Sequence, residues 1–281
     1  MTSTASSSPT PAIATKESVA KLFDYFRADL DDHNDRRERL IKASRDVTNL
    51  SKKTIFLLHR IMMEDPEANE QVLAKRAAHR GHEKLREVQN IYATLMEELE
   101  GDRFWRYQRQ VSPGLQEYIE ALSFAYYLEH GSLITFDGVQ QTLLNPQGYF
   151  PLTVSDYLLG LSDLTGELMR FAISGISRRG GQKKATEVCA FVRGYFERFT
   201  PYVRDLSKKQ SVTSQSLEKI EDVAYAIFVR SSEYDIPPEM LDDIVAQSIS
   251  SYSGSPYGQE HRGRPGRRID DVTDDDQEND M

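Results

Sequence analysis

Between residue 17 and Pro66 the chain carries a helical hydrophobic repeat that no proline interrupts. Apolar side chains recur at spacings of three, four or their sums, which places them on one face of an α-helix. The outer face is polar, most clearly in the stretch DDHNDRRER. The repeat therefore predicts one or two helices with a combined length above about forty residues. Its apolar positions are Val19, Phe23, Phe26, Leu30, Leu40, Val47, Leu50, Leu57 and Ile61.

The rest of the chain is also predicted to be helical. A second long helix is expected from Pro66 to Leu99, because proline suits the first turn of a helix. Neither a strand-like alternation nor an internal repeat is present. The sequence therefore predicts an all-α bundle of about seven helices, two of them long and N-terminal. Further helices are expected at 115–130, 135–144, 153–177, 182–199, 214–235 and 237–248, with breaks at Pro113-Gly114, Asn145-Pro146, Gly180-Gly181 and Pro237-Pro238.

Both ends of the chain differ from this helical domain in composition. Residues 1–16 are rich in Ser, Thr and Pro, and residues 249–281 turn from Ser/Gly/Pro-rich to basic and then acidic. Such segments rarely pack, so both are expected to be disordered tails flanking a domain at residues 17–248. RGRP, at residues 262–265, resembles the core of an AT-hook, which binds DNA in the minor groove. A flexible basic linker or a nuclear-import patch is the alternative.

Composition limits the class of protein. With 39% hydrophobic and 28% charged residues, the chain can build a sizeable core. A single cysteine, Cys189, excludes an intramolecular disulfide and fits a reducing compartment. There is neither a secretory-signal pattern nor an apolar run long enough for a membrane span, so a soluble intracellular protein is expected. The net charge of −9 argues against a simple basic nucleic-acid binder, so affinity for a polyanion must come from local basic patches or bound cations.

One predicted helix contains polar residues that its apolar surroundings do not explain. The segment DYLLGLSDLTGELMR, residues 156–170, is apolar on most of its circumference but contains Asp163 and Glu167. Their spacing of four residues puts both carboxylates on one face. Gly160 and Gly166 lie beside them, and each glycine costs about 1 kcal/mol relative to alanine in a helix interior. Close approach of another helix or of a ligand to this face would offset that cost.

A second segment behaves in the same way. LQEYIEALSFAYYL, residues 115–128, is apolar nearly all round, yet Glu117 and Glu120 share one of its faces. Along their own helices the four acids have no basic neighbour within four residues, except that Glu167 has an arginine three residues on. Burying several unpaired carboxylates together is costly. If the two helices face each other, a divalent cation that prefers oxygen ligands, Mg²⁺ or Mn²⁺, would neutralise them.

Other arrangements would also accommodate these acids. They can face solvent along a narrow polar strip, or meet arginines from a neighbouring helix. A ferritin-like di-iron site is disfavoured, because none of the six histidines follows a glutamate by three residues. His79 and His82 share a helix face and could ligate a metal, but they lie in a strongly polar run that favours a solvated face.

Two basic stretches are candidates for phosphate contacts. The loop SRRGGQKK, residues 177–184, follows the acid-bearing helix and could grip phosphates near a metal, with a solvated turn as the alternative. A second stretch in the first helix could touch a nucleic-acid backbone, although its arginines alternate with acids as on an ordinary exposed face. The cations of the loop are Arg178, Arg179, Lys183 and Lys184, and those of the first helix are Arg36, Arg37 and Arg39.

These segments together resemble the translin superfamily. The resemblance covers about residues 18–245 and leaves out both tails. It is most specific in the block DYLLGLSDLTGELMR, whose acids and glycines come in a fixed order. The matching stretches are RRERLIKASRDVTNLSKKTIFLLHR, LQEYIEALSFAYYLEHGSL, SDYLLGLSDLTGELMR and LEKIEDVAYAIFVRSSE.

The resemblance implies a helical bundle that assembles with translin into a closed, shell-like hetero-oligomer. A subunit of this kind is expected to carry a Mg²⁺-dependent endoribonuclease site for single-stranded or small processed RNAs, while translin subunits supply much of the RNA binding. The family's catalytic and metal-binding acids fall on Glu117, Glu120, Asp163 and Glu167. The alternative is a non-catalytic scaffold that stabilises translin and binds other proteins or DNA.

Location and assembly are further expectations. Family members often carry a basic nuclear-localisation stretch near the N-terminus, whereas residues 1–35 hold only Lys16, Lys21 and Arg27. A cytoplasmic and nuclear protein is expected, with nuclear entry through RGRPGRR or through a partner. The aromatic stretches FAYYL and RFWRY are expected to exceed what one core buries, and therefore to drive assembly.

Overall fold

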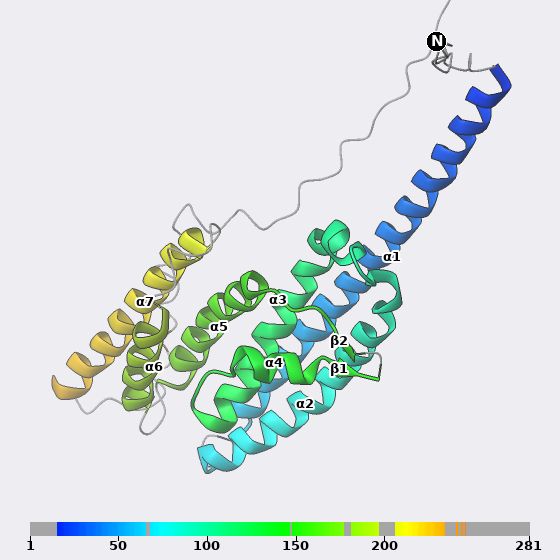
Figure 1. The fold of residues 1–281 in the computed structure, drawn as a ribbon. Coiled ribbons are helices and arrows are strands. Elements are labelled where there is room, and N and C mark those ends of the chain that lie inside the picture. The colour runs from blue at the N-terminus through cyan, green and yellow to red at the C-terminus, as the bar shows by residue number, and fades with distance from the viewer. Residues whose placement is uncertain are drawn as a thin grey trace, which may run out of the picture.

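The computed structural model describes residues 16–65, 68–146, 148–176, 181–196 and 206–233, together with residues 240, 243 and 245. Within these residues the chain folds into seven α-helices, which confirms the predicted all-α bundle (Figure 1). None of these helices is long and apolar enough to cross a membrane. Nearly all of both predicted tails, including RGRP, lies outside the described residues. The helices are α1 (Lys16–Met62), α2 (Glu70–Leu95), α3 (Arg103–His130), α4 (Phe136–Thr142), α5 (Val154–Gly175), α6 (Gly181–Phe196) and α7 (Leu206–Glu233), with a short 3-10 helix, η1 (Glu97–Leu99), after α2.

Helix α3 is the centre of the bundle. It packs against α1, α2 and α5, while α6 and α7 pack on α5 and on each other (Figure 1). Tyr118, Ile119 and Leu122 of α3 are essentially fully buried. The order of packing brings α1 and α7, which lie at opposite ends of the described chain, to either side of the α3–α5 pair.

Helix α3 is longer than predicted, because it runs through Pro113-Gly114, where a break was expected. A proline inside a helix removes one intrahelical hydrogen bond. The N–H of Gly114 donates to Oγ of Ser44 in α1 at 3.1 Å, and a Cβ at Gly114 would lie only 2.8 Å from the carbonyl oxygen of Ser44. Close packing on α1 therefore offsets the local cost and keeps α3 continuous.

Several other boundaries differ from the prediction. Helix α2 begins at Glu70, where the side chain of Asn69 caps it by accepting from the N–H of Gln71, and Pro66 lies outside the described residues. Helix α7 begins at Leu206 rather than at residue 214. The unpredicted strands β1 (Leu144–Asn145) and β2 (Gly148–Tyr149) form a small antiparallel hairpin, too short to give an alternating pattern. The predicted helix at 237–248 falls mostly outside the described residues.

Helix α1 has a buried half and an exposed half. From Leu40 onward its apolar side chains enter the core. The N-terminal half instead projects beyond the bundle (Figure 1). The apolar repeat that predicted this helix therefore continues past the end of the chain's own core. Its exposed apolar residues, here called the α1 stripe, are Val19, Leu22, Phe23, Tyr25, Phe26 and Leu30, with exposed fractions between 38% and 68%.

The aromatic stretches FAYYL and RFWRY are mostly buried, contrary to expectation. Phe124, Tyr127, Phe104 and Tyr107 all belong to the core, and only Trp105 is strongly exposed. The rings fit because α3 is central and has neighbours on several sides. Three of the aromatic residues that the core leaves exposed, Phe23, Tyr25 and Phe26, lie in the α1 stripe instead.

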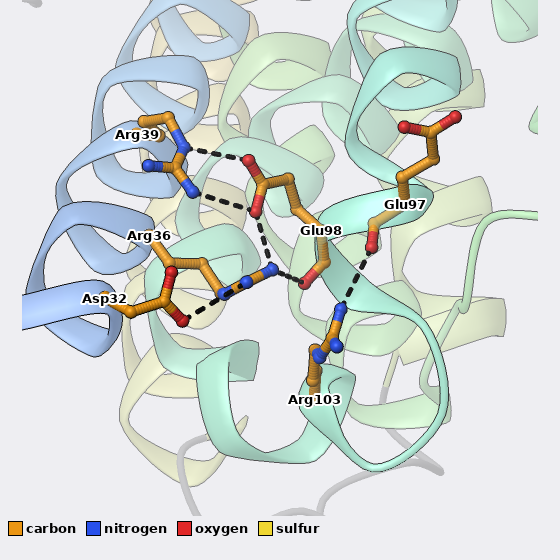
Figure 2. A network of polar contacts seen from close by, with 6 residues as sticks. All are labelled: Asp32, Arg36, Arg39, Glu97, Glu98 and Arg103. Atoms are coloured by element: carbon orange, nitrogen blue, oxygen red, sulfur yellow. Dashed lines mark hydrogen bonds and ion pairs between the residues drawn. The ribbon is translucent and has the colours of Figure 1, made fainter. Parts of the chain in front are cut away.

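An ionic network joins the middle of α1 to the turn after α2. Figure 2 shows Arg36 and Arg39 of α1 converging on the carboxylate of Glu98 in η1. Nη1 of Arg36 lies 2.7 Å from Oε2 of Glu98, and Nε of Arg39 lies 2.8 Å from Oε1. Arg37 pairs with Glu38 at 2.8 Å. The guanidinium groups of these arginines are thus engaged in ion pairs within the chain, and their contact with a nucleic-acid backbone stays a prediction.

Replacing Glu98 by alanine is expected to lower the free energy of unfolding by about 1–3 kcal/mol, because Arg36, whose side chain is largely buried, would lose the nearer of its two charged acceptors. The hydrogen bond from Arg39 and the charges of both arginines hold the pKa of Glu98 below its ordinary value of 4.5. This stabilisation is therefore present above about pH 4.5 and is lost as the pH falls through the lowered pKa. Denaturant unfolding at neutral and acidic pH measures both effects.

The neighbouring Glu97 provides the matched control. Its side chain is exposed, and only its carbonyl oxygen accepts a hydrogen bond, from Arg103 (Figure 2). Glu97→Ala should change stability by less than about 0.5 kcal/mol. Equal effects of the two substitutions would show that the network contributes nothing specific.

Candidate functional site

Helices α3 and α5 approach each other closely at Gly160. A Cβ added there would lie 2.8 Å from Cβ of Ile119 and 2.9 Å from the carbonyl oxygen of Gln116, both in α3. Gly160 therefore allows the close helix approach that the sequence suggested. Gly166 differs, because no atom lies within 4 Å of the corresponding position. Helix packing does not explain the second glycine.

A buried carboxylate, Asp156, sets the register between these two helices. Asp156 is 2% exposed and lies in the first turn of α5, which Thr153 caps by accepting from the N–H of Asp156. Its oxygens accept from Oγ1 of Thr153 at 2.7 Å and from two α3 side chains, Nε2 of Gln116 at 2.9 Å and Oγ of Ser112 at 3.2 Å. Several donors thus satisfy the buried charge. The bonds from Ser112 and Gln116 hold the middle of α3 against the start of α5.

This packing brings together the four acids that the sequence singled out. Glu117 and Glu120 come from α3, and Asp163 and Glu167 come from α5. Burial, together with the charges of Asp163, Glu117 and Glu167, raises the pKa of Glu120 to about 9, against a smaller opposing effect of Lys209. Glu120 therefore lies within electrostatic reach of all three other acids. Among the described residues it has no hydrogen bond or ion pair of its own.

The other three acids each have a partner from another helix, a lysine for two of them and a histidine for the third. Lys52 of α1 lies 3.1 Å from Glu117, and Lys209 of α7 lies 2.5 Å from Asp163. Nε2 of His59 in α1 lies 2.6 Å from Oε2 of Glu167. The sequence considered arginines from a neighbouring helix, whereas the structure supplies two lysines and a histidine. Nothing local could have revealed them, because they come from helices distant in sequence.

His59 is the most enclosed of these partners. It is 9% exposed, and its ring packs against Phe124 with centroids 4.7 Å apart. Burial alone would raise the pKa of Glu167, but the hydrogen bond from His59 and the charges of His59 and Arg170 outweigh it and hold that pKa below 4.5. The ionised carboxylate can only accept, so Nε2 of His59 carries the proton. His59 thus fixes both the charge and the orientation of Glu167.

Comparison with known proteins shows which family the chain belongs to. The family model described as "Translin family" matches residues 35–231, well over half of the chain. The chain belongs to the translin family. It is 36% identical to translin-associated protein X of Mus musculus over 253 residues, which covers 80% of this chain and 83% of that protein. Its identity to the translin-associated protein X homolog of Schizosaccharomyces pombe is 28% over 222 residues, covering 74% and 87%.

Two solved structures share this helical fold. The crystal structure of apo-NeC3PO matches with a TM-score of 0.56 at 18% identity, covering 78% of this chain and 98% of that chain. The crystal structure of AfC3PO matches with a TM-score of 0.53 at 21% identity, covering 74% and 97%. At these identities the likeness establishes the translin-type helical fold alone.

The carboxylate chemistry of the four acids suits a divalent cation, but the arrangement of their side chains in this structure does not. Carboxylate oxygens are the ligands that Mg²⁺ and Mn²⁺ prefer, and Glu120 is a carboxylate without a partner. In the part of the chain that the structure describes, however, no group of three or more His, Cys, Asp or Glu side chains is disposed to hold a metal ion. Three of the four carboxylates are engaged by cations of the protein instead. A metal would therefore require their side chains to rearrange.

The basic loop after α5 is only partly described. Arg178 and Arg179 lie outside the described residues. Lys183 pairs with Glu187 at 3.9 Å, and Lys184 pairs with Glu70 of α2 at 3.0 Å. Contact of this loop with RNA phosphates stays a prediction.

Proposed function

We propose that this translin-family chain is the catalytic subunit of a Mg²⁺-dependent endoribonuclease that works in complex with translin and cleaves single-stranded or small processed RNAs. The observation that carries the proposal is the meeting of four carboxylates from α3 and α5, one of which, Glu120, has no partner among the described residues. Support also comes from the similarity to proteins named translin-associated protein X, whose name itself refers to translin.

In this proposal Glu117, Glu120, Asp163 and Glu167 hold the cation. Bound there, Mg²⁺ would polarise the scissile phosphate and help a water molecule to attack it. Other residues of this chain organise the site. Asp156 and Gly160 hold α3 against α5, and His59 keeps Glu167 ionised. Glu120 has to lose its proton for the cation to bind, because protonation removes the charge that attracts the metal.

The test is RNA cleavage by the complex co-purified with translin. Single-stranded RNA should be cut in the presence of Mg²⁺ and left intact when the metal is chelated. Undiminished cleavage in excess chelator would show that the four acids do not act through a cation. A complex that binds RNA but never cuts it would favour the scaffold function instead.

The scaffold function has one observation in its favour. Lys52, His59 and Lys209 contact three of the four acids without any metal. Such pairs are also expected where acids only fasten helices together. The behaviour of Glu120 distinguishes the two functions, because Glu120 has no structural partner in the part of the chain that the structure describes.

The α1 stripe supports the proposed assembly with translin. Six large apolar side chains on a helix that projects from the bundle form a surface of the kind that partner subunits cover. We expect Phe26→Asp to detach this chain from the complex, because a buried interface would not tolerate the new charge. Size-exclusion chromatography with light scattering on the co-expressed proteins measures the detachment.

Ala28→Asp is the matched control for this substitution. Ala28 lies two residues further along α1 and about 160° around the helix from Phe26, at 100° of rotation per residue. The Ala28→Asp substitution adds the same charge to the same exposed segment and should leave the complex intact. If both variants assemble like the wild type, the stripe is not the interface with translin.

A further inference from the structure

The cation closest to the four acids in this structure is an ammonium group of the chain itself. Nζ of Lys209 lies 2.5 Å from Oδ2 of Asp163 and donates a second hydrogen bond to the carbonyl oxygen of Leu159 at 3.2 Å. Its charge also acts on Glu120 across the α3–α5 contact. Lys209 of α7 therefore interacts with acids from both helices of the site, Asp163 of α5 and Glu120 of α3.

The backbone that carries Lys209 is firmly placed. Thr213, one turn further along α7, is buried, and its Oγ1 lies 3.0 Å from Oγ1 of Thr165 in α5. Oγ1 of Thr213 also donates to the carbonyl oxygen of Lys209 at 3.2 Å. The side chain of Lys209 is less confined, with an exposed fraction of 29%. The ammonium can therefore withdraw toward solvent while α7 stays docked on α5.

We propose that the Lys209 ammonium is a built-in competitor of the divalent cation, so that a metal ion reaches Asp163 only when the Lys209–Asp163 pair opens. This inference rests on the proposed function, because it takes the four acids as the cation site. A site that must first open binds its ligand with an affinity reduced by the fraction of molecules that are open. Removing the ammonium should therefore tighten metal binding, whereas removing a carboxylate should weaken it.

Lys52 is a weaker competitor by the same argument. Its side chain is 62% exposed, and it lies 3.1 Å from Glu117 with no second hydrogen bond in the described part of the chain. Exposed pairs of this kind contribute little. Among the cations at the cluster, Lys209 combines the shortest approach of a lysine with an additional backbone acceptor, so its removal should have the larger effect.

The experiment is Mn²⁺ binding to the full-length chain in its complex with translin, followed by electron paramagnetic resonance. Lys209→Met should bind Mn²⁺ about fivefold more tightly or better, and Lys209→Gln should do the same while retaining a hydrogen-bond donor for Leu159. Lys84→Met is the control, since Lys84 forms a similarly charged pair with Glu87 on α2. It should change the affinity by less than about twofold.

Measurement at high salt separates direct competition between the Lys209 ammonium and the metal ion from a general effect of the changed net charge. At about 0.5 M KCl, long-range effects of a lost charge are screened within a few ångströms. The tighter binding in Lys209→Met should persist there. An affinity in both Lys209 variants that equals or falls below that of the wild type overturns the inference.

Failure of the proposed function would look different. A Mn²⁺ ion at the four acids should be lost on Asp163→Asn substitution. If neither the wild type nor Lys209→Met binds such an ion, the four acids are not a metal site and both proposals fall. If the ion binds equally to wild type and to both Lys209 variants, only the competition is wrong. Melting temperatures close to the wild type confirm that the variants are folded.

Discussion

Replacing Glu120 by glutamine is expected to reduce RNA cleavage at least about a hundredfold while leaving the fold as stable as the wild type or more stable. Glu120 has no hydrogen bond or ion pair in the described part of the chain, so the substitution breaks no contact. It removes a carboxylate that burial and three neighbouring acids disfavour. Cleavage rates and melting temperatures of the co-purified complex measure the two effects together.

The pH dependence of this variant is a second measurable consequence. The pKa of Glu120 is raised from 4.5 to about 9, so its ionised form is disfavoured in the folded protein. In the metal-free protein this costs stability progressively as the pH rises from about 4.5 toward 9. The gain in melting temperature of Glu120→Gln should therefore be larger near pH 8 than near pH 5, because the cost accumulates over the whole interval between these two pH values.

The other acids are less suitable for separating catalysis from stability. Glu167→Ala would leave the enclosed Nε2 of His59 without its acceptor, at a cost of about 1–3 kcal/mol. Asp163→Ala and Glu117→Ala release Lys209 and Lys52, which are partly exposed and should cost less. Both should lose cleavage and melt close to the wild type. Cleavage at the wild-type rate in saturating Mg²⁺, for these variants or for Glu120→Gln, would contradict the metal site.

Replacing Gly160 by alanine is expected to lower the free energy of unfolding by about 2 kcal/mol or more, although alanine favours helices. The added Cβ would meet Cβ of Ile119 at 2.8 Å and the carbonyl oxygen of Gln116 at 2.9 Å. Neither atom is the end of a flexible side chain, so α3 and α5 must move apart. Denaturant unfolding measures the loss, and cleavage should fall as well, because the acids lie on the same two helices.

Gly166→Ala is the matched control in the same helix. No atom lies within 4 Å of the position that its Cβ would occupy, so alanine should stabilise α5 by up to about 1 kcal/mol. Equal behaviour of the two glycine variants would contradict the close helix contact. Should Gly166→Ala be stable yet bind RNA more weakly, the open space beside Gly166 would be a place that the RNA backbone approaches.

The helices could largely be predicted from the sequence because their signals are local. The apolar repeat predicted α1, and the spacing of Asp163 and Glu167 placed both carboxylates on one helix face. Where tertiary packing outweighs a local signal, prediction failed. Pro113-Gly114 indicates a break by itself, but the contact of Gly114 with Ser44 keeps α3 continuous. The same limit applies to FAYYL and RFWRY, whose burial depends on the neighbours that surround α3.

By itself the sequence determined which four acids lack a local counter-charge, because a helix fixes the neighbours of each residue within four positions. Only the tertiary structure decided what meets those acids. His59 is 108 residues from Glu167, and Lys209 is 46 residues from Asp163, so no periodicity connects them. It likewise decided that Gly160 is needed for helix contact and Gly166 is not. Helix spacing is a property of the local backbone, whereas the partner of a side chain depends on which helices the whole core brings together.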